Sequence, residues 1–145
     1  MRFSLIGFFL FAFLLGPVQA QGDISIDNAW ARATPPGAAN AAIYFKLSNT
    51  GQADEQLLGA SSESADHAGL HTHVHKDGMM QMTPVDMIEI PAGGEAVLKP
   101  HGDHVMLMGI RKPLKEGESV VLDLVFRQSG KMRLNIPVHK EAPGG

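Results

Sequence analysis

The 145-residue sequence contains no cysteine. A disulfide framework and a cysteine nucleophile are therefore excluded, and so is a blue-copper electron-transfer centre, because that centre requires a cysteine thiolate ligand. The stability of the folded chain must instead come from a packed apolar core, which a chain of this length can supply.

Aromatic residues and excess positive charge are also scarce. Five of the seven phenylalanines fall within the first twenty residues, which leaves Trp30, Tyr44, Phe45 and Phe126 as the aromatics of the remaining chain. These are too few for a groove that stacks sugars or bases, and we expect them in the core. The formal net charge is −3 without a cluster of Lys and Arg, which argues against nucleic acid and anionic membranes as partners.

The sequence has one long apolar run, Leu5 to Leu15, and it is shorter than the ~20 residues that span a bilayer. Arg2 before the run and Val18-Gln19-Ala20 after it are typical of a secretory signal peptide. We therefore expect residues 1–20 to be cleaved, and we expect the protein in the bacterial periplasm with no membrane span. Residues 21–139 are expected to form one domain, followed by a flexible tail over residues 140–145.

Short β-rich runs separated by turn signals recur from Ile24 to Val138, and no window shows a sustained helical period. Asp77-Gly78 is a strong signal for a tight hairpin, and Ser129-Gly130 predicts a second hairpin near the end of the chain. Eight or nine strands at this spacing predict an all-β fold, an antiparallel β-sandwich of immunoglobulin-like or cupredoxin-like architecture.

Histidine and methionine are concentrated in one window. Six of the seven histidines and six of the eight methionines lie between His67 and Met108. Ten residues separate His71 from Met82, and twenty-one residues separate Met82 from His104, with Met106 two positions beyond His104. Imidazole suits copper and zinc, and thioether sulfur is soft and selects Cu(I), so this mixed set predicts a copper site.

Strand geometry supports this interpretation. His104 and Met106 would project from one face of a strand that begins near solvent, with Val105 and Leu107 directed into the sandwich. We expect other methionines to fill gaps in the core, namely Met79, Met80, Met87 and Met108.

Further histidines lie close to this set. His73 and His75 alternate with His71, a pattern that suits zinc or Cu(II), and we treat both as possible accessory ligands. His101 is a candidate for a supporting role or for an alternative Cu(II) ligand.

The segment from Leu70 to Met108 resembles the PCuAC-type periplasmic copper(I) chaperone family. The resemblance is carried by the four-residue spacing and by the stretches 77–82, 90–94 and 98–108, and it continues to the last hairpin. It implies a cupredoxin-like sandwich that binds Cu(I) at His71, Met82, His104 and Met106. Family members often have glycine at the position of His101, and some have methionine at the position of Thr72; neither difference removes a ligand.

The resemblance further implies delivery of Cu(I) to the binuclear copper site of cytochrome c oxidase, through its copper subunit or a Sco-type partner protein. The competing interpretation is a periplasmic protein that buffers copper or zinc, or confers metal resistance, through the same cluster. A β-sandwich adhesion module without metal is a third class.

No hydrolase or metalloprotease motif is present, so we do not expect an enzyme. The protein could act as a monomer or as a metal-bridged dimer.

Overall fold

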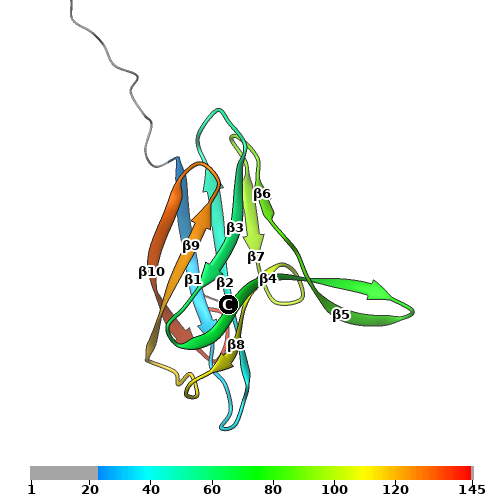
Figure 1. Cartoon of the computed structure of the whole chain (residues 1–145), viewed down its shortest axis with the longest axis vertical. Helices are drawn as coiled ribbons and strands as arrows, with labels where there is room; N and C mark the ends of the chain where they lie inside the picture. Colours follow the sequence, from blue (N-terminus) through cyan, green and yellow to red (C-terminus); the bar gives the residue numbers. More distant parts are fainter. Residues whose placement is uncertain (1–22, 145) are drawn as a thin grey trace, which may run out of the picture.

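The computed structural model describes residues 23–144, and the expected signal peptide lies outside them. Ten strands and no helix make up this part of the chain, which confirms the all-β prediction (Figure 1). No helix in residues 23–144 is long and apolar enough to cross a membrane. The strands are β1 (Ile24–Arg32), β2 (Asn40–Asn49), β3 (Glu55–Ser61), β4 (Ala65–Lys76), β5 (Met79–Pro84), β6 (Ile88–Ile90), β7 (Glu95–Leu98), β8 (His104–Ile110), β9 (Ser119–Phe126) and β10 (Gly130–His139).

The strands form two layers that are joined along one edge. One layer runs β5-β4-β8-β2-β1, with β7 also paired to β2, and the other runs β10-β9-β3-β6. β1 and β10 connect them through a parallel pairing in which Ala31 lies opposite Val138. The predicted antiparallel β-sandwich is confirmed, except that this one pair is parallel because the last strand runs beside the first in the same direction. The remaining strand pairs are antiparallel.

The core lies between the layers and is made by alternate residues of the strands. In β9, Val120, Leu122, Leu124 and Phe126 are buried while the residues between them are more exposed. Phe45 and Phe126 belong to this core, as expected. Trp30 and Tyr44 are also buried but lie outside the core cluster, against each other, with ring centroids 4.9 Å apart. The apolar core supplies the stability that disulfides supply in many small exported domains.

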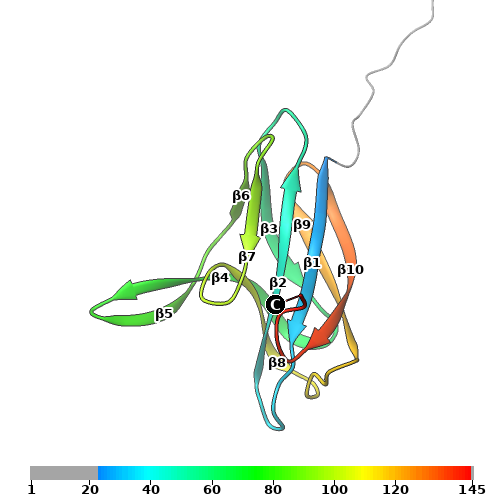
Figure 2. The ribbon, with the colours of Figure 1, turned by 180° about the vertical axis from the view of Figure 1, so that it is seen from behind.

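The hairpin of β4 and β5 extends sideways from the sandwich, well beyond the other strands (Figures 1 and 2). Its tip is Asp77-Gly78, and both residues have positive φ, 53° and 76°. A tight two-residue hairpin turn requires this conformation at its two central positions, which is why Asp-Gly occurs there. The turn fixes the register, with Lys76 opposite Met79 and His71 opposite Pro84.

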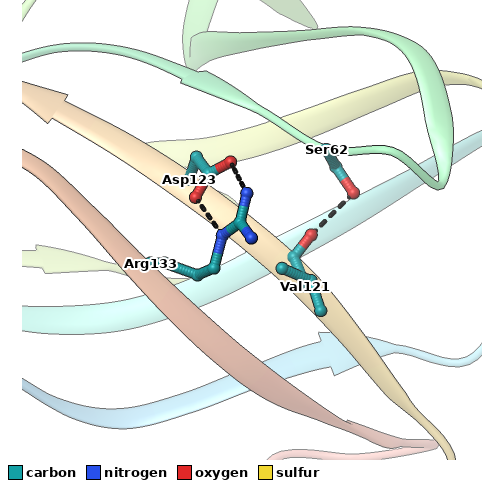
Figure 3. A network of polar contacts seen from close by, with 4 residues as sticks. All are labelled: Ser62, Val121, Asp123 and Arg133. Carbon is teal, nitrogen blue, oxygen red and sulfur yellow. Dashed lines mark hydrogen bonds and ion pairs between the residues drawn. The ribbon is translucent and has the colours of Figure 1, made fainter.

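Polar contacts tie the outer surface of the second layer together (Figure 3). Arg133 of β10 donates two hydrogen bonds to Asp123 of β9, at 2.8 and 3.0 Å. The hydroxyl of Ser62, just after β3, donates to the carbonyl of Val121 at 2.8 Å. The bond to Arg133 holds the pKa of the Asp123 carboxyl below its ordinary value.

One buried carboxylate organises the turn between β9 and β10. Glu55 is 4% exposed, and its two oxygens accept four hydrogen bonds from Gln56, Gln128 and Ser129. Burial raises the pKa of Glu55, but these hydrogen bonds favour the charged form more strongly and the net pKa is lowered. The carboxylate therefore stabilises the fold in its ionised state.

We predict that Glu55→Gln lowers the free energy of unfolding by about 2 kcal/mol at neutral pH, because bonds to a charged acceptor are replaced by weaker ones. The unfolded chain binds a proton at Glu55 near its ordinary pKa of about 4.3, before the folded chain does. The stabilisation is thus present above that pH and is lost as pH falls further. Urea denaturation measures the free energy of unfolding, and the difference between wild type and variant should be smaller at pH 4 than at pH 7.

Glu89→Gln is the matched control, because Glu89 is an exposed carboxylate on the neighbouring strand β6. An equal loss of stability in both variants would contradict the assignment to Glu55.

Candidate metal centre

Strand β8 divides its side chains between two environments. Val105 and Leu107 are fully buried in the core, as predicted, and His104 and Met106 point to the other face of the same sheet. The expectation that this pair lies near solvent is wrong, because His104 is 1% exposed and Met106 is 8% exposed. Other parts of the fold cover these two side chains, and the local sequence pattern does not show which parts these are.

Strand β4 places a second imidazole beside His104. His71 lies directly opposite His104 in the pairing of β4 with β8, and their ring centroids are 5.9 Å apart with a 22° angle between planes. Two imidazoles that share a face at this separation are close enough to bind one ion between them.

Strand β5 brings methionine to the same face, but in a register that the spacing alone did not predict. Met82 lies opposite His73, two residues beyond His71 along β4. His71 and Met82 are therefore diagonal neighbours, and His73 lies between Met82 and His104, with its ring centroid 5.3 Å from that of His104.

An open hollow of about 360 Å³ lies at this junction. His73, Met82, His104 and Met106 line it, and His71 flanks it from its position opposite His104. Three of the four predicted ligands thus line one hollow together with His73, whereas the fourth, His71, is placed only beside His104 and is not part of the lining. The other lining residues are Arg32, Asn40, Ala41, Ala42, Tyr44, Pro100 and His101.

The two remaining candidates lie at the margin of this cluster. His101 is exposed, has a φ of 66°, and its ring centroid is 5.9 Å from that of His73. His75 is exposed and shares the face of His71 and His73 farther out on the hairpin. Among residues 23–144, no group of three or more His, Asp or Glu side chains is arranged to hold a metal ion.

The carbonyl of Gly102 orients the imidazoles. It lies 3.0 Å from Nδ1 of His104 and 3.4 Å from Nδ1 of His73. A carbonyl can only accept, so Nδ1 of His104 carries the proton and its Nε2 holds a free lone pair. Such a second hydrogen bond is typical of histidines that bind metals.

Two ring nitrogens of the cluster are buried without a hydrogen-bond partner anywhere in the described part of the chain, namely Nε2 of His104 and Nδ1 of His71. A buried polar atom left in this state costs about 1–3 kcal/mol. A metal ion bound at these nitrogens would remove that cost, which makes them suitable ligands.

The electrostatic environment keeps His104 neutral. Burial is the largest effect and lowers the pKa of His104, whereas the hydrogen bond to the Gly102 carbonyl raises it. The neighbouring His73 and His71 lower the pKa again, Asp103 raises it least, and the net pKa is lowered. A neutral imidazole is the form that binds metal. The hollow therefore presents neutral nitrogen and sulfur donors, which suit a soft, singly charged ion.

Residues 24–138 match the LpqE-like family of putative lipoproteins. A putative lipoprotein of Leifsonia xyli subsp. xyli is 33% identical over 121 residues, which cover 83% of this chain and 71% of that protein. The solution structure of Cu(I)-bound DR1885 from Deinococcus radiodurans is 34% identical, with a TM-score of 0.68, over 88% of this chain and 85% of that one.

The chain belongs to the LpqE-like family. This is the family of the PCuAC domains, so the resemblance noted in the sequence is confirmed. The copper-bound PCuAC domain from PmoF2 has the same fold, with a TM-score of 0.70 and 25% identity over 84% of this chain and 97% of that domain.

We predict that His104 is present as the Nδ1–H tautomer in the metal-free protein, because only that form donates to the Gly102 carbonyl. Long-range ¹⁵N–¹H NMR correlations at neutral pH should show a protonated Nδ1 and an unprotonated Nε2 for His104. The exposed His67 serves as the internal reference for an imidazole in contact with solvent. An Nε2–H tautomer at His104 would contradict the orientation described here.

Proposed function

We propose that this PCuAC-family protein is an exported copper chaperone that carries Cu(I) at His71, Met82, His104 and Met106. The observation that carries the proposal is the buried, unpartnered Nε2 of His104 beside a hollow lined with methionine sulfur and a further imidazole. The Cu(I)-bound form of the related Deinococcus protein supports copper as the ion.

The donor set suits a carrier that releases its ion. Neutral imidazoles and thioethers leave the single positive charge of Cu(I) uncompensated, so they hold it without the charge pairing that thiolates provide. Met82 is 52% exposed whereas His104 is 1% exposed. An incoming ligand therefore meets the methionine first and can replace the donors one at a time.

The biological role follows from this chemistry and from the family. We propose export by cleavage of residues 1–20, a copper-binding domain over residues 21–139 in the periplasm, and no enzymatic activity. The acceptor would be the copper subunit of cytochrome c oxidase or a thiol-bearing Sco-type protein. Transfer to a thiolate acceptor would be favourable, because thiolate is the stronger ligand for Cu(I).

Copper buffering is the second candidate, and the surplus of histidines around the site favours it. His73, His75 and His101 exceed what a four-ligand site needs. The rate of transfer separates the two functions. A chaperone passes Cu(I) to an apo acceptor faster than its own release to a chelator, whereas a buffer transfers no faster than it releases.

We predict that His104→Ala and Met106→Leu each weaken Cu(I) affinity at least tenfold, because loss of a direct ligand costs at least as much as loss of a group that orients one. Competition against a chromogenic Cu(I) chelator under anaerobic conditions measures the affinity. X-ray absorption should show one fewer sulfur neighbour for Met106→Leu.

Met87→Leu is the control, because Met87 is a partly exposed methionine that does not line the hollow. Unchanged Cu(I) affinity in both ligand variants, with the fold retained by circular dichroism, would exclude this site.

A further inference from the structure

The two faces of the β4–β5 hairpin carry different chemistry. On the face that continues into the metal centre, the pairs of opposed residues are His71 with Pro84, His73 with Met82, and His75 with Met80. On the other face they are Thr72 with Thr83, Val74 with Gln81, and Lys76 with Met79. Every histidine of the hairpin thus shares one face, and two of them stand opposite a methionine.

The outer pair, His75 with Met80, places one imidazole and one thioether directly opposite each other on adjacent strands. Residues directly opposite each other in antiparallel strands have Cβ atoms roughly 4.5–5.5 Å apart. An imidazole nitrogen and a thioether sulfur extending from such positions can reach one common ion. The Asp77-Gly78 turn lies two residues beyond His75 and fixes this opposition.

Exposure indicates that Met80 does not serve packing. The expectation that Met79, Met80 and Met87 fill gaps in the core is wrong, because they are 62%, 45% and 39% exposed. Exposed methionine on a projecting hairpin contributes little to stability, so its position opposite a histidine calls for another explanation (Figure 2).

We propose that His75 and Met80 form a second, outer Cu(I) site, through which copper reaches and leaves the buried centre. The inference deepens the proposed chaperone function and rests on it for its biological meaning. Two donors leave coordination positions of Cu(I) open, and an acceptor or donor protein can fill them. The site is weaker than the inner one because it has fewer protein ligands.

The pair of His73 and Met82 connects the two sites. It is the next pair inward along the hairpin, and the ring of His73 lies 5.3 Å from that of His104. Copper can pass between the sites by ligand exchange, in which one Cu–donor bond forms as another breaks. The ion remains Cu(I), and no proton or electron has to be supplied.

The test is a titration of the purified protein with two equivalents of Cu(I) under anaerobic conditions, followed by NMR of the methionine methyl groups. The first equivalent should shift the methyls of Met82 and Met106. The second should shift the methyl of Met80 and the ring of His75, and leave Met79 unchanged.

Variants on the two faces of the hairpin provide the matched comparison. The double variant His75→Gln, Met80→Leu should lose the second equivalent and keep the first. Met79→Leu should keep both, because Met79 is more exposed than Met80 but lies on the opposite face. All three positions are exposed, so the fold is expected to survive, which circular dichroism verifies.

A second equivalent that still binds in the double variant would overturn the proposal. The same holds for a wild type that takes up one equivalent without a shift at Met80, and for equal loss of the second equivalent in Met79→Leu. Failure of the proposed function gives a different result, since the first equivalent would then leave Met82 and Met106 unshifted.

Discussion

Alternation of side chains along β8 is the constraint on which the metal centre depends. Val105 and Leu107 are fully buried between the two layers, and each contributes roughly 1.5–3 kcal/mol through burial. A slip of the strand by one residue would exchange them for His104 and Met106, placing an imidazole in the apolar core. Core packing therefore fixes the direction in which His104 and Met106 project, and these two side chains need no interaction of their own to hold the register of the strand.

The hollow is completed by the loop that precedes β8. The backbone of Lys99 pairs with Asp103, and the amide of Gly102 donates to the carbonyl of Lys99, which closes a tight turn. That turn leaves the carbonyl of Gly102 directed at His104 and His73. One backbone group thus sets the orientation of imidazoles from two different strands. His101 adopts a left-handed φ in the same turn, a conformation that costs a non-glycine residue about 1–2 kcal/mol.

Much of this arrangement was predictable from the sequence, because it depends on local rules. Asp77-Gly78 predicted the hairpin, and the two-residue period predicted that His104 and Met106 share a face opposite Val105 and Leu107. Burial of His104 was not predictable, since it depends on a loop and a hairpin that meet only in the folded chain. The opposition of His73 with Met82 does not follow from the spacing of the four predicted ligands, but it does follow from the two-residue turn, which pairs Lys76 with Met79 and so sets every pair farther in. The parallel pairing of β1 with β10 joins the two ends of the domain, and no local pattern signals it.

The charge of the lining explains why such a site should favour a singly charged ion. None of the residues that line the hollow, all within the described part of the chain, is Asp or Glu, and Arg32 contributes a positive charge. The cost of moving an ion out of water rises steeply with its charge, and a lining without carboxylate supplies no opposite charge to offset it. Zn²⁺ would therefore pay a larger desolvation penalty than Cu(I) and would face repulsion from Arg32. Sulfur from Met82 and Met106 adds a preference for the softer ion. A preference of the proposed site for Cu(I) would thus follow from the absence of carboxylate in the lining as much as from the donors present.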